Sequence, residues 1–157
     1  IKKAKEMGVA VRGYVSCVIE CPYEGSIDSR EVSKLVKMLI QLGCYEVSLG
    51  DTIGKGTPKS VKSLLLDVCR EIDPSKLAGH FHDTNNNAIE NVREAISHGL
   101  AVFDSAIGGL GGCPYAPGAK GNLSTRDLIE GIGVENFCSN LNVKKIDEAE
   151  KLIMSFD

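Results

Sequence analysis

The sequence of 157 residues has no tryptophan, five prolines, four tyrosines and four phenylalanines. It also lacks an excess of either charge, since 18 Lys and Arg oppose 21 Asp and Glu, for a net charge of -3. A chain without a basic surplus gives no reason to expect nucleic acid or an anionic membrane as a partner. No apolar run reaches the roughly 18 residues that a membrane span needs.

A Gly-x-Gly-x-x-Gly that opens a helix after a first strand is also missing, so a dinucleotide-binding fold lacks support. A chain of this length can build a core without disulfides, so we interpret the cysteines as reduced intracellular thiols. They are scattered among apolar segments, at Cys17, Cys21, Cys44, Cys69, Cys113 and Cys138. Cys17 and Cys21 are close in sequence but lack a second cysteine pair, which argues against a structural zinc site.

Apolar periodicity predicts strands that alternate with helices. Strands are expected at residues 9–18, 45–49, 77–82 and 100–105. Helices are expected at residues 28–42, 57–72, 88–96, 124–132 and 143–156. Residues 1–8 are interpreted as the last turns of another helix, so we expect the sequence to be part of a larger protein.

Strands that alternate with helices predict a parallel sheet with right-handed crossovers. The helix-to-strand turns are tight, whereas the strand-to-helix loops contain the polar residues and glycines. This asymmetry places the chemistry at the carboxyl ends of the strands, as in barrels and in open α/β sheets. Four such units equal half of an eight-stranded barrel or one small open sheet.

The longest irregular stretch, residues 108–122, contains six glycines and sets Cys113 between Gly112 and Pro114. Glycine costs about 1 kcal/mol in a helix relative to alanine, so this stretch is predicted to be a loop. Flexible linkers are rich in Ser and Gly, not in a Gly-Cys-Pro-Tyr cluster. We therefore interpret it as a mobile active-site loop that presents Cys113 as a reactive or proton-donating thiol. The alternative is that Cys113 is a small buried apolar residue.

Two of the three histidines, His80 and His82, lie at the end of the third predicted strand. Residues i and i+2 of a strand point to one face, so both rings can bind one metal ion. The alternative is two partly buried histidines with structural hydrogen bonds. Asn122 offers a hard amide oxygen suited to Mg²⁺ or Mn²⁺, although an Asn after Gly is also typical of a turn.

Asp51 follows the second predicted strand, in the segment of residues 49–54. A carboxylate at the carboxyl end of a parallel strand is a candidate for substrate binding. An Asx turn or a helix cap is the alternative interpretation.

At these residues the sequence resembles the 3-hydroxy-3-methylglutaryl-CoA lyase family. The resemblance covers almost the whole chain, and its Gly-Gly-Leu-Gly-Gly-Cys-Pro-Tyr-Ala loop is close to a family signature. A His-x-His-Asp alone is shared with other metal-dependent Claisen enzymes. The matching segments are residues 12–17, 21–25, 43–54, 80–84 and 109–122.

The resemblance implies an α/β fold of the (β/α)8 TIM barrel family, of which this chain is the second half as a single partial domain. His80, His82 and Asn122 match the family's ligands for Mg²⁺ or Mn²⁺, and Cys113 matches its catalytic loop cysteine. The implied reaction is the retro-Claisen cleavage of 3-hydroxy-3-methylglutaryl-CoA to acetyl-CoA and acetoacetate, a step of ketone body formation and leucine degradation. His80 is counted with Cys113 among the catalytic residues.

The resemblance further implies an acyl-CoA thioester as substrate and a homo-oligomer, a dimer, for the complete enzyme. It implies a cytoplasmic location in a bacterium and the mitochondrial matrix in a eukaryote. Two departures from the family stand out. The first half of the barrel, with a catalytic Arg and a metal-binding Asp, is not within these residues. Arg126 stands where the family is expected to have an acidic residue, while Asp127 is retained.

Other interpretations are a related metal-dependent condensing enzyme or carboxyltransferase, and a non-catalytic half-barrel that serves assembly. A half-barrel leaves two strand edges unpaired, at residues 11–16 and 100–105, and such edges promote association. The isolated chain is therefore expected to be inactive and poorly soluble. It is also expected to expose apolar inner faces, formed by Val15, Val47, Leu49 and Val102.

Overall fold

The computed structural model describes residues 1–114, 120–136 and 141–156. A sheet of four strands lies at its centre, and each pair of neighbouring strands is parallel. The strand order is β1 (Arg12–Val15), β4 (Glu46–Asp51), β5 (Leu77–Phe81) and β6 (Val102–Asp104). The predicted parallel sheet is confirmed, although β1 and β6 are shorter than the sequence suggested.

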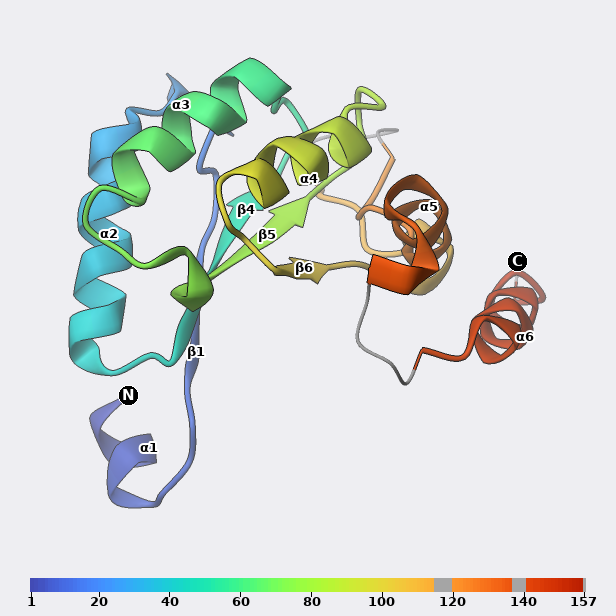
Figure 1. Cartoon of the computed structure of the whole chain (residues 1–157), viewed down its shortest axis with the longest axis horizontal. Coiled ribbons are helices and arrows are strands. Elements are labelled where there is room, and N and C mark those ends of the chain that lie inside the picture. The colour runs from blue at the N-terminus through green and yellow to red at the C-terminus, as the bar shows by residue number, and fades with distance from the viewer. Residues whose placement is uncertain (115–119, 137–140, 157) are drawn as a thin grey trace.

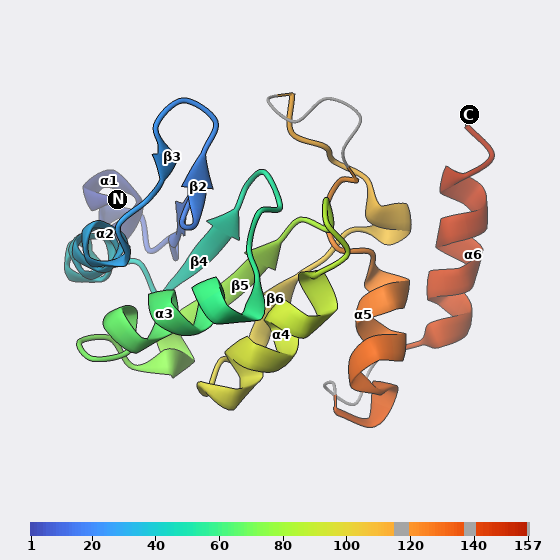
Figure 2. The same ribbon diagram turned by 90° about the horizontal axis from the view of Figure 1, so that it is seen from above.

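Helices α2 (Ser29–Leu42), α3 (Pro58–Val68) and α4 (Ala88–Ser97) cover one face of this sheet (Figure 2). The residues at their ends explain their limits. Asp28 accepts a hydrogen bond from the Arg30 amide at the start of α2, and Gly43 ends that helix in the left-handed region. Thr57 caps α3, with Pro58 at its first position.

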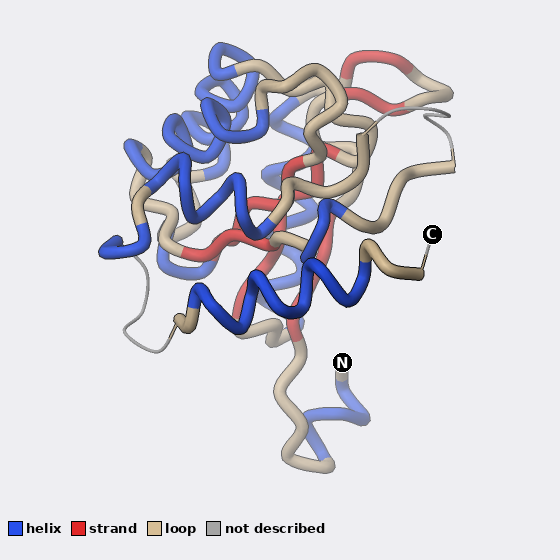
Figure 3. Tube along the Cα trace, turned by 90° about the vertical axis from the view of Figure 1, so that its right-hand side faces the viewer, coloured by secondary structure: helices blue, strands red, loops and turns tan. Residues whose placement is uncertain are grey.

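The other helical elements lie at the ends and edges of the sheet (Figures 1 and 3). They are α1 (Lys2–Glu6), α5 (Thr125–Ile132), α6 (Val143–Ile153) and three 3-10 turns, η1 (Pro74–Lys76), η2 (Ile107–Gly109) and η3 (Val134–Asn136). None of the helices in the described part of the chain is long and apolar enough to cross a membrane.

The hydrophobic core lies between the sheet and its helices. Val36, Val61 and Leu65 from the helices pack with Val47 and Leu77 from the strands, and all five are fully buried. At about 25 cal/mol per Å² of apolar surface, burial of this layer is the main stabilising contribution to the fold.

The prediction of an exposed apolar inner face is wrong for three of its four residues. Val15, Val47 and Leu49 are 7%, 0% and 1% exposed because they point toward the helices. Only Val102, at 39% exposed, remains on the open side. Every residue of β4 is buried, but Val47 and Leu49 face the helices while Glu46 and Ser48 face the other side of the sheet.

Two boundaries and one hairpin also differ from the expectation. A short antiparallel hairpin, β2 (Glu20–Cys21) and β3 (Gly25–Ser26), follows β1 where no strands were expected. Helix α3 ends at Val68 instead of residue 72. Ile72 lies in the following turn, where its amide donates to the Val68 carbonyl and its side chain is buried in the core. The last helix ends at Ile153 instead of residue 156.

Replacement of Asn91 tests how α4 supports the loop after β4. Asn91 is fully buried and its Nδ2 donates to the Gly56 carbonyl at 3.1 Å. We expect Asn91→Ala to lower the free energy of unfolding by about 1–3 kcal/mol, because the buried carbonyl loses its partner. Thermal or denaturant unfolding of the complete protein measures this change.

The matched control is Asn136→Ala, since Asn136 makes a comparable bond to the Ile132 carbonyl at an exposed position. We expect a change of less than about 0.5 kcal/mol for it. Equal losses in both variants would contradict the buried role of Asn91.

Candidate active site

The two histidines of β5 lie on the same side of the sheet, at its carboxyl end. His80 belongs to β5 and His82 follows it by two residues, and their ring centroids are 5.5 Å apart. His80 faces Tyr14 of β1 edge-on, with 6.4 Å between the rings. The strand spacing therefore brings both imidazoles together, as the sequence predicted.

Asn122 reaches the histidines through a short antiparallel bridge with His82. The Leu123 amide donates to the Phe81 carbonyl at 3.0 Å, and the Asp83 amide donates to the Gly121 carbonyl at 3.0 Å. Glycine is needed at residue 121 because a Cβ there would lie 2.5 Å from the Gly109 carbonyl oxygen. Residues 40 positions apart thus become neighbours.

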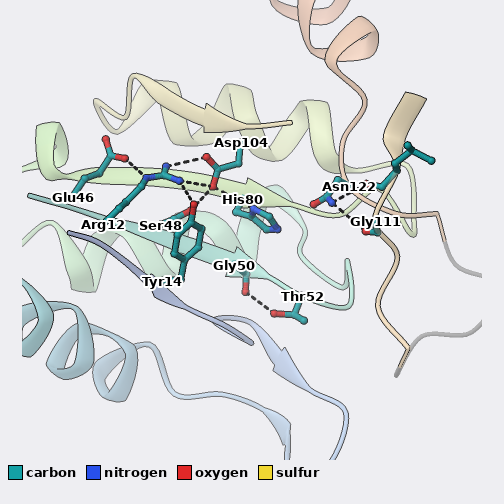
Figure 4. A network of polar contacts seen from close by, with 11 residues as sticks. Arg12, Tyr14, Glu46, Ser48, Gly50, Thr52, His80, Asp104, Gly111 and Asn122 are labelled. Carbon is teal, nitrogen blue, oxygen red and sulfur yellow. Dashed lines mark hydrogen bonds and ion pairs between the residues drawn. The ribbon is translucent and has the colours of Figure 1, made fainter. Parts of the chain in front are cut away.

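The amide nitrogen of Asn122 donates to the carbonyls of Leu110 and Gly111, at 2.9 and 3.1 Å. These bonds fix the orientation of the amide and leave its oxygen as the group available to a ligand. Figure 4 shows this oxygen turned toward the His80 side of the site.

One carboxylate, beside His80, joins all four strands (Figure 4). Asp104 of β6 lies 3.2 Å from Nδ1 of His80 and accepts a hydrogen bond from Ser48 of β4 at 2.7 Å. Arg12 of β1 reaches both carboxylate oxygens, at 2.9 and 3.1 Å. Arg12 also pairs with Glu46 at 2.5 Å and donates to the hydroxyl of Tyr14, whose ring lies 5.0 Å below the guanidinium.

The network sets the charge of its members. Burial opposes ionisation of Asp104, but hydrogen bonds from His80, Arg12 and Ser48 outweigh it and hold the pKa of the carboxyl well below its ordinary value. For Arg12, hydrogen bonds to Asp104 and Glu46 outweigh the effect of burial and raise the pKa of the guanidinium. The ion pair between Arg12 and Asp104 is therefore charged at any physiological pH.

These residues fit a divalent cation. Burial, and then the neighbouring His80, lower the pKa of His82 and favour the neutral imidazole that a metal requires. The carboxylate of Asp104 at Nδ1 of His80 leaves Nε2 for a ligand, the usual arrangement behind a metal-binding histidine. In the described part of the chain no three His, Cys, Asp or Glu side chains group around one point. Asn122, which bridges to His82, is the candidate for a third donor.

The hydrogen bonds of Asp51 lead to the loop after β4 and not to the histidines. Its side chain is 1% exposed and accepts hydrogen bonds from the amides of Gly56 and Lys55, at 2.7 and 3.1 Å. Burial raises the pKa of Asp51, and these two amides oppose the shift. This is the geometry of a turn-forming carboxylate, and the role of Asp51 in substrate binding stays a prediction.

Cys113 is half-exposed on the segment that follows η2. Burial raises the pKa of the Cys17 thiol, and the nearby thiols of Cys21 and then Cys113 add to the effect. Cys17 itself, just after the carboxyl end of β1, adopts a left-handed conformation with φ of 56°. Residues 115–119 of the loop, and Cys138, lie outside the described residues.

Sequence reasoning missed the polar inner face, which consists of Arg12, Tyr14, Glu46, Ser48 and Asp104. The signal was present as spacing, because residues 12 and 14, and residues 46 and 48, are i and i+2 pairs. Their register pairs Arg12 with Glu46 and Tyr14 with Ser48. Asp104 is paired directly with His80. An alignment of the predicted strands would have placed these side chains on the face of His80.

A parallel sheet covered by helices on one face, with polar side chains on the other face and at its carboxyl end, defines part of an α/β barrel with its active-site rim. The family model described as HMGL-like matches residues 1–153. The chain belongs to this family, which confirms the resemblance and the barrel fold.

Named relatives agree. The cytoplasmic 3-hydroxy-3-methylglutaryl-CoA lyase of Homo sapiens is 49% identical over 153 residues, which are 98% of this chain and 41% of that protein. The mitochondrial hydroxymethylglutaryl-CoA lyase of Macaca fascicularis is 47% identical over 156 residues, 98% of this chain and 47% of that protein. The structure of the HMG-CoA lyase from Brucella melitensis superposes with a TM-score of 0.94 at 44% identity, over 99% of this chain and 55% of that one. The chain spans less than half the length of these two curated relatives.

Replacement of Asp104 tests its support of His80. We expect Asp104→Asn in the complete protein to weaken Mn²⁺ binding by about 10- to 100-fold, as is typical when the carboxylate behind a metal-binding histidine is lost. Titration calorimetry with Mn²⁺ measures the affinity. Asp67→Asn is the control, because Asp67 bonds to Ser29 and Arg70 on the helical layer. Unchanged Mn²⁺ affinity in Asp104→Asn would rule out this support.

Replacement of Asp51 separates a turn from a substrate contact. In Asp51→Asn the new side-chain NH₂ group would face one of the two backbone amides, and two donors cannot form a hydrogen bond. We therefore expect the free energy of unfolding to fall by about 1–3 kcal/mol. Asp73→Asn, at the exposed cap of η1, is expected to cost less. A raised KM with unchanged thermal stability would instead assign Asp51 to the substrate.

Proposed function

We propose that this chain forms the metal-binding half of a carbon-carbon lyase that cleaves 3-hydroxy-3-methylglutaryl-CoA to acetyl-CoA and acetoacetate. The observation that supports this most is the convergence of His80, His82 and Asn122 at the carboxyl end of β5. The names of the similar proteins support the substrate, an acyl-CoA thioester. Residues 1–157 are proposed to act as one domain that a preceding half of the barrel completes, in a homo-oligomer.

His80, His82 and Asn122 would hold a divalent cation, Mg²⁺ or Mn²⁺. When bound, such a cation lowers the pKa of the substrate hydroxyl and stabilises charge on the acyl oxygen. Asp104 fixes the ring of His80 through Nδ1, and Arg12 keeps Asp104 ionised and in place. We therefore assign His80 to the metal ligands, and it would count as a catalytic residue through the cation that it holds beside the reacting hydroxyl.

The reaction breaks the bond between the hydroxyl-bearing carbon and the carbon next to the thioester. The hydroxyl loses its proton to a base, its oxygen becomes the ketone of acetoacetate, and the electrons of the broken bond form the enolate of acetyl-CoA. The enolate carbon then needs one proton. The thiol of Cys113 is proposed to donate it, and the loop would keep water from the enolate.

Replacement of Cys113 tests the proton donor. A hydroxyl is a far weaker acid than a thiol, whose ordinary pKa is about 8.5, so Cys113→Ser in the complete enzyme is expected to lower kcat by about 100-fold or more. Mn²⁺ affinity is expected to stay close to that of the unmodified protein, because Cys113 is not among the proposed ligands. Steady-state cleavage of 3-hydroxy-3-methylglutaryl-CoA and Mn²⁺ titration give the two values.

Cys69→Ser is the matched control, since Cys69 follows α3 in the helical layer. Full activity is expected for it. Equal losses of turnover and metal affinity in Cys113→Ser would make Cys113 a ligand or a structural residue. A complete protein that binds Mn²⁺ but cleaves no acyl-CoA would favour another reaction of the same metal site.

A further inference from the structure

The acidic position that the family resemblance led us to expect is occupied by Arg126, which lies in the first turn of α5. Its guanidinium faces α6, where Nη2 lies 2.7 Å from Asp147 and Nε lies 2.5 Å from Glu150. Asp147 and Glu150 are three residues apart, so they share one face of α6. A single arginine thus contacts two carboxylates on one side of the next helix.

Electrostatics favour this arrangement. Hydrogen bonds to Glu150 and Asp147 raise the pKa of Arg126 above its ordinary value. A third carboxylate, Glu130 on α5 itself, lies 3.7 Å from Nη1. An acidic residue at position 126 would instead face three negative charges. The arginine and the acidic face of α6 therefore fit each other.

Helix α6 has few other attachments in the described part of the chain. It buries no residue, and Figures 2 and 3 show it at the outer surface beside α5 and η2. One of its apolar contacts is with η2. Ile153 and Met154 lie 3.7 and 3.9 Å from the place where a Cβ on Gly108 would stand.

The turn η2 is the base of the segment that contains Cys113. Residues 110–112 connect η2 to Cys113, and the carbonyls of Leu110 and Gly111 hold the amide of Asn122. Ala106, just before η2, bonds to Leu123 and Thr125 at the start of α5. Helix α6 lies against η2 and therefore restrains the segment that supports Cys113 and Asn122.

We propose that Arg126 is a positioning residue that docks α6 against η2 and thereby fixes the base of the Cys113 segment. Its effect on turnover rests on the proposed role of Cys113, but the docking itself does not. Arg126 touches neither the histidines nor the substrate in this scheme. It acts through Asp147 and Glu150, then through the contact of α6 with Gly108.

Hydrogen-deuterium exchange of the complete protein tests the docking. Arg126→Glu is expected to speed amide exchange about tenfold in residues 143–153 and 107–113, because each half-exposed ion pair shifts an equilibrium a few-fold and two become repulsions. The charge-reversed triple variant R126E/D147K/E150K is expected to restore slow exchange in both segments. Lys145→Glu is the control, because the ion pair of Lys145 in the described part of the chain is with Glu148, within α6 itself.

Turnover is the second measurement. We expect kcat of Arg126→Glu to fall about fivefold, with KM nearly unchanged and recovery in the triple variant, because a misplaced catalytic group lowers the rate of the chemical step. Unchanged exchange at residues 107–113 in Arg126→Glu, or no recovery in the triple variant, would overturn the proposal. If the complete protein had no lyase activity, the proposed function would fail, while the exchange data would still decide the docking.

Discussion

The carboxylate of Asp104 is the point on which the inner face of the sheet depends. Arg12, Ser48 and His80 approach it from β1, β4 and β5, and it stands on β6 itself. Such a carboxylate is stable in a half-buried position only while these donors remain, since an unpaired buried charge is costly. The same bonds fix the ring of His80. The network that holds the four strands in register therefore also prepares the proposed metal site.

Division of the sheet into two faces explains how stability and chemistry coexist in so short a segment. The face under α2, α3 and α4 is apolar and largely buried, and it supplies the core. The opposite face contains ionised and hydrogen-bonding side chains, which a closed barrel would surround with further strands. Loops at the carboxyl edge then add Asn122 and Cys113. Those loops depend on close backbone contacts at Gly121 and on η2, against which α6 lies.

Local pattern predicted much of this arrangement. The alternation of strands and helices, the capping residues at Asp28 and Thr57, and the i and i+2 spacing of His80 and His82 all report short-range geometry. The same reasoning gave the wrong face for Val15, Val47 and Leu49. The sequence of β4 alternates polar and apolar residues, but this pattern does not say whether helices or the inside of a barrel cover the apolar side. The packing of α2, α3 and α4 decides that.

The sequence by itself determined the order of the strands and helices, the pair of histidines and the glycine-rich segment with Cys113, because each depends on residues close together in the chain. Only the tertiary structure decided that Asn122 bonds beside His82, that Asp104 collects donors from three other strands, and that Arg126 faces Asp147 and Glu150. These contacts join residues about 20 to 90 positions apart. Their partners are chosen by strand register and helix packing, which no local spacing encodes.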